Sequence, residues 1–302
     1  MKHYEEAFDR EVEETAAFLF ESVQSSKTSA KISHYTRALA VNAIFVNGTI
    51  RFTRWDFLND MSEFTYVYGL VQEALEADGY DEEFCRYMRE ISDIHYTIRK
   101  SPEHPHSEDY YVASFSFNHD CLPLWSNYAK MNEADGYSIQ FSRHELKKSL
   151  QNKNGVSIFQ GCVIYDVETQ KGIVNKILSS LNTLYGIVDD EEDRAERIAA
   201  CFEEYISIVA GFFKHPSFAN EEEFRFVFKC YKDETRYPIK SRVLNGIIIP
   251  CIDLEFDREI CEKITVSPAV NPATAQNGLR FLRELVGARF DIAVSCIPYR
   301  NI

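Results

Sequence analysis

Residues 214–228 read KHPSFANEEEFRFVF, which predicts a helix end, a break at Pro216 and then a strand. Side chains alternate between the two faces of a strand, so Glu223, Arg225 and Val227 are expected on one face and the intervening phenylalanines on the other. The aromatic face can be buried against a core. The other face then presents a carboxylate and a guanidinium where the strand begins, just after Glu221. This pattern fits either a ligand cleft or an exposed edge strand with an internal Glu–Arg pair.

The composition is that of a folded globular protein. The chain has 302 residues, of which 45% are hydrophobic and 14% aromatic, enough for a substantial core. The net charge of −14 disfavours non-specific binding to nucleic acid or to an anionic membrane, because a surface of like charge repels phosphates. This net charge does not exclude a local basic groove. Nothing in the sequence marks a domain boundary, so a single domain over 1–302 is expected.

Cysteine usage predicts a reducing compartment, and hydropathy predicts that no segment spans a membrane. The eight cysteines are scattered, without a Cys-x-x-Cys pair, and most lie in apolar runs typical of reduced core residues. The N-terminus has no signal-peptide pattern, and no apolar run approaches the roughly 20 residues that span a bilayer. These features predict a cytoplasmic protein with no membrane contact.

Hydrophobic periodicity predicts an α+β fold. An N-terminal helix is expected within 1–28 and a helical insertion over 167–213. Strand patterns occur at 32–36, 49–53, 110–117, 136–141, 156–165, 223–228, 245–253, 261–267 and 290–296. Helical patterns occur at 4–25, 37–46, 62–77, 81–99, 167–184, 191–213 and 273–286. Such an order fits a mixed or antiparallel sheet core with flanking helices.

The common nucleotide-binding and zinc-binding motifs are absent, and 12 glycines make a glycine-cradled phosphate site improbable. Two segments could bind a metal ion. The histidines of His104-Pro105-His106 could chelate one, although an exposed loop explains them better. Oxygen ligands for a hard cation could come from Asp56, Asn59, Asp60 and Glu63, although a helix cap at Asn59 or Asp60 explains them better. These residues support one alternative, a metal-dependent hydrolase or nuclease.

Several short blocks, taken in order, resemble the bacterial domain-of-unknown-function family 2971 over residues 30–300. The blocks are His34-Tyr35-Thr36, Arg51-Phe52-Thr53, Asn59-Asp60-x-x-Glu63, Ser114-Phe115-Ser116, Leu124-Trp125-x-x-Tyr128-Ala129, and the segment from Lys214 to Arg225. The arrangement is also similar to the ADP-ribosyltransferase superfamily, which implies a sheet core of that type.

The resemblance to ADP-ribosyltransferases implies a role for each matching position. His34 matches the histidine or arginine of the first core strand. Ser114, Ser116 and Tyr128 match the second element, and Glu223 matches the glutamate of a later strand. Glu221-x-Glu223 resembles the Glu-x-Glu of some transferases, in which the first carboxylate helps the acceptor and the second engages NAD. This sequence departs from the family in lacking a clean Ser-Thr-Ser, and Tyr35, Tyr128 and Tyr137 all remain candidates for the ring that stacks on nicotinamide.

The implied function is an NAD-dependent ADP-ribosyltransferase or NAD glycohydrolase that needs no metal, and by analogy a toxin or phage-defence effector. Glu223 and Glu221 would be catalytic, because a carboxylate stabilises the positive charge that develops on ribose. Tyr35, Trp125 and Arg225 would complete the NAD-binding set with His34, Ser114, Ser116 and Tyr128. The acceptor stays open between a protein, a nucleic acid and water. The main alternative is a catalytically inactive module that binds a nucleotide or a protein.

Overall fold

The computed structural model describes residues 2–24, 30–60, 62–77, 79–101, 108–129, 133–231, 235–244 and 246–299. His104 and His106 of the predicted chelating loop lie outside these residues. Contacts between Cα atoms divide the chain into two compact units. Unit 1 comprises 1–25, 58–107 and 161–218, and unit 2 comprises 26–57, 108–160 and 219–302. This division does not test the expectation of a single domain over 1–302, which remains a prediction.

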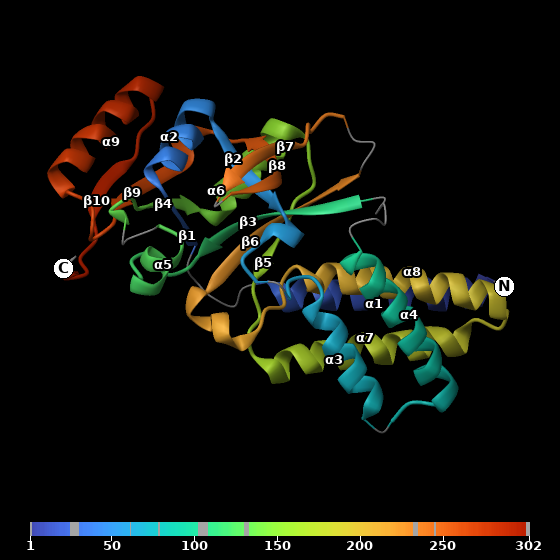
Figure 1. Cartoon of the computed structure of the whole chain (residues 1–302). Coiled ribbons are helices and arrows are strands. Elements are labelled where there is room, and N and C mark those ends of the chain that lie inside the picture. Colours follow the sequence, from blue (N-terminus) through green and yellow to red (C-terminus); the bar gives the residue numbers. More distant parts are fainter. Residues whose placement is uncertain are drawn as a thin grey trace. The chain divides into compact units, whose positions relative to one another are not determined.

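Unit 1 is helical (Figure 1). Its helices are α1 (Lys2–Val23), α3 (Tyr66–Glu76), α4 (Glu82–Lys100), α7 (Val167–Ile187) and α8 (Glu191–Ala210). The N-cap residues of α4, α7 and α8 are aspartates, Asp81, Asp166 and Asp190. Each side chain accepts a backbone N–H of the first turn, which explains where these helices begin. The predicted helical insertion over 167–213 corresponds to α7 and α8. α1 packs on both of them, and α3 packs on α4 and α7.

Unit 2 contains most of a ten-stranded sheet. The main path runs β10-β9-β4-β1-β3-β2-β8-β7, while β6 pairs with β3 and with β5. The parallel pair β9–β10 makes the sheet mixed, because β1, β2, β3, β4, β6, β7 and β8 pair antiparallel. The strands are β1 (Lys31–Thr36), β2 (Thr49–Arg54), β3 (Glu108–Ser116), β4 (Tyr137–Ser142), β5 (Phe159–Cys162), β6 (Glu223–Tyr231), β7 (Lys240–Leu244), β8 (Ile247–Glu255), β9 (Cys261–Val266) and β10 (Asp291–Val294).

The helices described in unit 2 are α2 (Ala38–Asn47), α5 (Leu122–Asn127), α6 (Arg143–Asn154) and α9 (Pro272–Val286). α6 packs on β4 and β8, α2 on β2 and β4, and α9 on β9 and β10. The predicted α+β fold with a mixed sheet and flanking helices is therefore confirmed. Within the residues that the structure describes, no helix is both long and apolar enough to cross a membrane.

Three details differ from the predictions. The exposed edge strand considered for 223–228 is wrong, because β6 pairs with β3 at nine positions and also with β5, and both of its faces are buried. The strand predicted over 156–165 shortens to β5. The strand β7 was not predicted, because Lys240, Ser241 and Arg242 break the alternation of apolar and polar residues.

The register of the sheet creates one polar row. Residues directly opposite one another on paired strands lie on the same face of the sheet. The row crosses β9, β4, β1, β3 and β6, and each of its residues is paired with the next. Its members are Lys263, Gln140, Ser33, Ser116 and Glu223. The opposite face is aromatic where β3 meets β6, since the rings of Phe115, Phe224 and Phe226 contact one another there. The polar row is the base of the candidate site.

Charge is distributed unequally between the two units. Unit 1 contains 28 Asp and Glu residues and 11 Lys and Arg residues, a net charge of −17. Unit 2 contains 19 and 22 of these residues, a net charge of +3. The acidity of the whole chain is therefore a property of the helical unit. The electrostatic objection to phosphate ligands does not extend to the unit that carries the polar row.

Candidate functional site

Two buried carboxylates meet where β6 begins. Glu221 is the last residue of the short 3-10 helix η3 (Pro216–Glu221), and Glu223 is the first residue of β6. Between them Glu222 has a φ of 41°, a left-handed conformation that is uncommon for a residue with a side chain. Its carbonyl accepts the N–H of Phe117, which helps to hold the turn. Only 8% of Glu221 and 5% of Glu223 is exposed.

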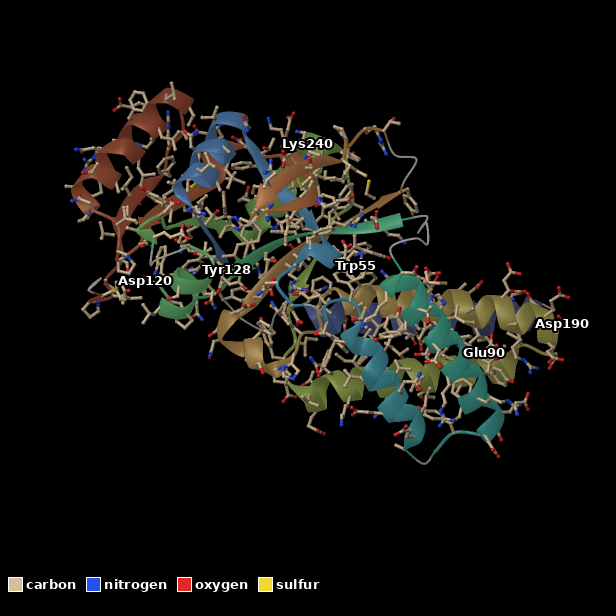
Figure 2. All side chains as sticks on the ribbon, in the orientation of Figure 1. Trp55, Glu90, Asp120, Tyr128, Asp190 and Lys240 are labelled. Atoms are coloured by element: carbon tan, nitrogen blue, oxygen red, sulfur yellow. The ribbon has the colours of Figure 1, made fainter. Side chains whose placement is uncertain are left out.

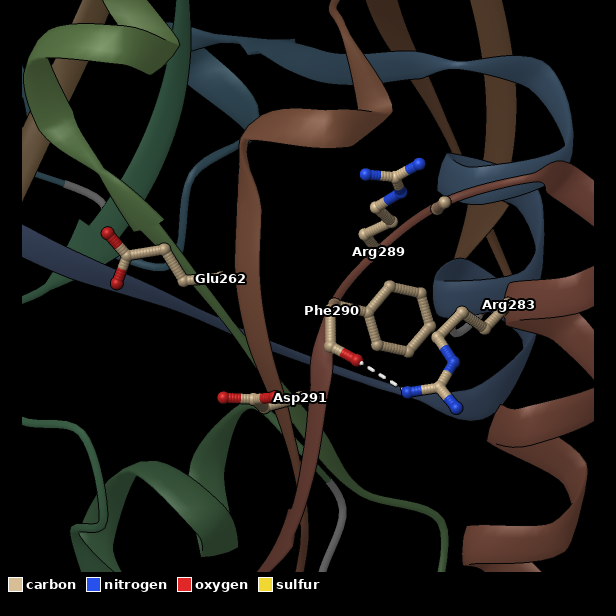
Figure 3. Close-up of a pocket in the computed structure, with 6 residues that line it drawn as sticks. Glu262, Arg283, Arg289, Phe290 and Asp291 are labelled. Atoms are coloured by element: carbon tan, nitrogen blue, oxygen red, sulfur yellow. Dashed lines mark hydrogen bonds between the residues drawn. The ribbon is translucent and has the colours of Figure 1, made fainter.

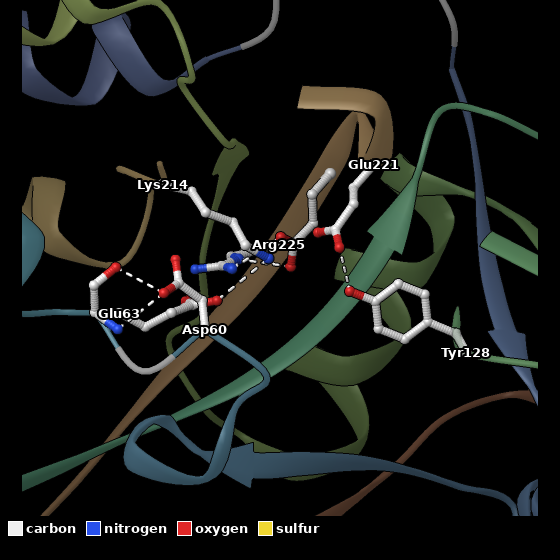
Figure 4. Close-up of polar contacts among 8 residues, drawn as sticks. Asp60, Glu63, Tyr128, Lys214, Glu221 and Arg225 are labelled. Carbon is white, nitrogen blue, oxygen red and sulfur yellow. Dashed lines mark hydrogen bonds and ion pairs between the residues drawn. The ribbon is translucent and has the colours of Figure 1, made fainter. Parts of the chain in front are cut away.

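The carboxylate of Glu221 is held by the chain that follows β3. The hydroxyl of Tyr128, at the end of α5, donates a hydrogen bond to Oε1 of Glu221 (Figure 4). The hydroxyl of Ser116 donates to the backbone carbonyl of Glu221 at 2.6 Å and accepts the N–H of Asn118 at 3.0 Å. Three predicted site residues, Ser116, Tyr128 and Glu221, are therefore brought together.

The carboxylate of Glu223 forms a bidentate ion pair with Arg225 (Figure 4). Nε of Arg225 lies 2.7 Å from Oε1 of Glu223 and Nη2 lies 2.8 Å from Oε2. Only 1% of Arg225 is exposed, so this is a buried pair. Two parallel N–H···O bonds fix both side chains on the face of β6 that carries the polar row. Ser114 lies opposite Arg225 on β3.

Tyr35 and Trp125 form an aromatic cluster beside these residues. Their ring centroids are 4.8 Å apart, and Tyr128 packs against the same cluster. The hydroxyl of Tyr35 donates to the carbonyl of Asn118 at 2.9 Å and accepts the N–H of Cys121 at 3.1 Å. Burial raises the pKa of Tyr35, so this phenol stays protonated. Tyr137 lies on β4, opposite Thr36. Tyr128 is thus the one of the three candidate rings that contacts a carboxylate of the pair.

His34 is not brought to the two glutamates. Ser33 lies in the polar row, so the next residue of β1 projects to the opposite face, where the ring of His34 is 5.5 Å from that of Phe115. Nδ1 of His34 lies 2.9 Å from the carbonyl oxygen of Ser114, and a carbonyl only accepts, so Nδ1 carries the proton. Burial lowers the pKa of His34, which is neutral at pH 7.

Two residues that the sequence analysis did not select contact the polar row or the aromatic cluster. Nδ1 of His119 lies 2.9 Å from the hydroxyl of Ser33. Burial lowers the pKa of His119, and the positive charges of Lys263 and Lys31 lower it further. The second residue is Asp120. Both lie in the turn after β3, which has no periodic pattern to mark them. Trp125 offered a weak signal, because a buried indole N–H needs an acceptor nearby.

Asp120 ties the C-terminal segment to the aromatic cluster. Its Oδ1 accepts Nε1–H of Trp125 and the hydroxyl of Ser295, both at 2.7 Å. Its Oδ2 accepts the N–H of Cys296 at 2.9 Å and the thiol of the same residue at 3.2 Å. Burial would raise the pKa of Asp120, but the hydrogen bonds from Ser295, Trp125 and Cys296 outweigh burial and lower it.

These bonds predict acid-dependent stability. A lowered pKa in the folded state means that the stabilisation is complete above the unfolded value near 3.9 and is lost as the pH falls through the folded value. We expect Asp120→Asn to lower the free energy of unfolding by about 1–2 kcal/mol at pH 7, and the difference from wild type to shrink below about pH 4. Urea unfolding between pH 3 and 8 measures this. A difference that does not change across this range would contradict the assignment.

The residues considered as metal ligands have other partners. Asp56 accepts two hydrogen bonds from Arg54, at 2.6 and 2.7 Å. Asp60 accepts the N–H and the hydroxyl of Ser62, and Glu63 pairs with Lys214. The predicted cap at Asn59 or Asp60 is wrong, because α3 begins only at Tyr66, after a turn. Over the described part of the chain, no group of three or more His, Cys, Asp or Glu residues could hold a metal ion.

One cavity lies elsewhere in unit 2. It has a volume of about 370 Å³ and is lined by Glu262, Arg283, Ala288, Arg289, Phe290 and Asp291 (Figure 3). Charges of both signs line it, and Nη1 of Arg283 donates to the carbonyl of Phe290 at 3.0 Å. It contains neither glutamate of the buried pair, so we do not assign it to the same site.

Comparison with known proteins agrees with part of the resemblance drawn from the sequence. Residues 124–226, from α5 to β6, match the family described as protein of unknown function DUF2971. This stretch includes Trp125, Tyr128, Glu221, Glu223 and Arg225. No curated protein matches the chain. A solved structure of Thermus sp. 2.9 DarT in complex with ADP-ribosylated ssDNA aligns over 92% of this chain and 97% of DarT, with 10% identity and a TM-score of 0.33.

Proposed function

We propose that unit 2 binds NAD and cleaves its nicotinamide–ribose bond, passing ADP-ribose to water or to another acceptor. The observation that supports this proposal is the pair of buried carboxylates at the start of β6, one bonded to Tyr128 and the other to Arg225. A carboxylate fixed in a site with little water can stabilise a developing cation far more than the same group in solvent. Ser116 and Tyr128 would position the substrate beside it.

The reaction needs few groups. The bond between C1′ of the ribose and the nicotinamide nitrogen breaks, and its electron pair leaves with the ring, which becomes neutral. The ribose acquires oxocarbenium character, as in other glycosyl transfers. Glu221 is the carboxylate that we expect to face this charge, because both oxygens of Glu223 are held by Arg225. Glu223 then acts as a positioning residue for the start of β6. The acceptor, water or another nucleophile, bonds to C1′ of the ribose and releases a proton to solvent.

Nicotinamide release from NAD by the purified full chain tests this function. We expect release that a chelator does not affect, a loss of 100-fold or more in Glu221→Gln, and a loss of about tenfold in Tyr128→Phe. The matched control is Glu284→Gln, which removes an exposed carboxylate from α9 and should leave the rate unchanged. Release that is equal in wild type and Glu221→Gln would overturn the assignment. Release that disappears with a chelator would favour the hydrolase alternative.

A second candidate is a module that binds a nucleotide without cleaving it. Two observations favour it: the charge of Glu223 is compensated by Arg225, and the hydroxyl of Tyr35 is occupied by two backbone bonds. Calorimetric titration of NAD separates the two functions. Binding of intact NAD without any nicotinamide release, with or without cell extract as a source of acceptor, would support the binding module.

A further inference from the structure

The strands β2, β8 and β7 lie next to one another at one end of the main strand path (Figure 1) and carry a cationic cluster. Thr53, Cys251 and Lys240 are directly opposite one another across these three strands, and Arg51 is opposite Asp253. Since residues two apart on a strand share a face, Arg51, Thr53, Asp253, Lys240 and Arg242 all lie on one face. Lys240 is labelled in Figure 2.

Arg242 is the unusual member of this cluster. Its Nε is buried and has no hydrogen-bond acceptor among the described residues. Its Nη2 has one contact, with the hydroxyl of Thr53 at 3.5 Å, which is the outer limit of a hydrogen bond. A guanidinium keeps its charge in a protein, so burial does not neutralise it. Burial and the charge of Arg51 both lower the pKa of Arg242, and the opposing effect of Asp253 does not offset them.

Among the residues that the structure describes, the surrounding charges do not compensate the charge of Arg242. Asp253 is the carboxylate of the cluster, and it is committed to Arg51 through two bonds of 2.7 and 2.9 Å and to Lys240 at 3.4 Å. Arg51, Lys240 and Arg242 therefore share one carboxylate, which leaves two positive charges. The side chains of Arg51 and Lys240 are 39% and 52% exposed, so a ligand can reach the cluster from solvent.

We propose that Arg242, Arg51, Lys240 and Thr53 bind a phosphate monoester. A dianion matches the uncompensated charge of the cluster, and a phosphate offers three oxygens to the N–H groups of Arg242 and to the hydroxyl of Thr53. A carboxylate would supply half of that charge. A buried donor without an acceptor destabilises the protein, and the bound phosphate would remove this penalty. The inference concerns a site apart from the buried glutamates and does not rest on the proposed function.

Calorimetry and thermal unfolding of the full chain test the site, with inorganic phosphate as the probe and sodium chloride at equal ionic strength as the reference. We expect phosphate to bind and to raise the melting temperature above the chloride reference. Arg242→Gln should bind phosphate about 10- to 100-fold more weakly. Without phosphate this variant should be as stable as wild type or more stable, because it removes an unsatisfied and repelled cation. Arg280→Gln, on the exposed surface of α9, is the control and should bind as wild type does.

Further arms separate the sources of phosphate and guard against a folding defect. Thr53→Val removes one hydroxyl and should weaken binding about threefold to tenfold, which keeps the test valid if Arg242→Gln does not fold. ADP, which has a terminal phosphate, should compete with inorganic phosphate, whereas a dinucleotide with a single phosphodiester should not. Equal binding by wild type and Arg242→Gln, an equal response to chloride, or binding of the diester alone would each overturn the proposal.

Discussion

Glu223→Gln is expected to lower the free energy of unfolding by about 3–5 kcal/mol. The substitution leaves Arg225 buried, with 1% of its surface exposed and without the carboxylate that binds its Nε and Nη2. A neutral amide offers one oxygen and turns its other end, an NH₂ group, toward the guanidinium. Removing one partner of a buried ion pair is far more costly than removing both, because a desolvated charge remains.

Urea or thermal unfolding of three variants measures this effect. Glu223→Gln should have the lowest melting temperature of the three, about 10 °C below wild type for a unit of this size. The double variant Glu223→Leu/Arg225→Met should recover part of the loss, because it removes both charges of the pair and keeps similar volumes. Glu133→Gln serves as the control. Its carboxylate pairs with Arg37 at the surface, where both side chains are more than a third exposed, and should cost less than about 1 kcal/mol.

If Glu223→Gln is as stable as wild type, the pair is not buried in the folded protein and its geometry here is wrong. The expected destabilisation also changes how activity data should be interpreted. Loss of activity in Glu223→Gln reports on folding as well as on catalysis, so it must be compared at equal folded fraction. Glu221→Gln is the cleaner test of chemistry, because the Tyr128 hydroxyl can still donate to an amide oxygen at that position.

The alternation of residues 223–228 was sufficient to predict a strand, its aromatic face and the proximity of Glu223 to Arg225. It was not sufficient to predict that β6 is internal. Burial of both faces depends on β3 and β5, which are remote in the sequence, and on a register that no local pattern specifies. The charged face of β6 therefore looked like a surface although Arg225 is among the most buried side chains.

The candidate site was predictable only in part, because it too depends on strand pairing that local sequence does not specify. The resemblance to ADP-ribosyltransferases implied Ser116, Tyr128, Glu221 and Glu223, and the structure bonds Ser116 and Tyr128 to Glu221. His34 lies on the other face of β1 from the polar row, because the pairing of Ser33 with Ser116 assigns the polar face to Ser33, and its predicted role stays a prediction. Asp120 and His119 were missed because their partners, Ser295 and Ser33, are distant in sequence and their own segment is an irregular turn.

Lys214, the first residue of the stretch that opened the sequence analysis, belongs to a second buried ion pair, in unit 1. Its Nζ lies 3.4 Å from Oε1 of Glu63, and the side chains of both residues are 1% exposed (Figure 4). The same Nζ lies 4.6 Å from the ring centroid of Phe218, a cation–π contact that a buried ammonium favours. Nε2 of Gln170 donates to the backbone carbonyl of Lys214 at 3.0 Å, which fixes the chain at this point.

Glu63→Gln is therefore expected to lower the free energy of unfolding of unit 1 by about 3–5 kcal/mol, and Lys214→Met by a similar amount. Each removes one charge of a buried pair, whereas Glu63→Leu/Lys214→Met removes both and should be closer to wild type than either single variant. Unit 1 also supplies a matched exposed pair, Lys171 and Glu73, at 3.0 Å with side chains 42% and 60% exposed. Glu73→Gln should cost less than about 1 kcal/mol. Hydrogen exchange of α3 and α8, compared among the four variants, measures the loss within this unit. Equal protection in Glu63→Gln and Glu73→Gln would show that burial adds nothing to this pair.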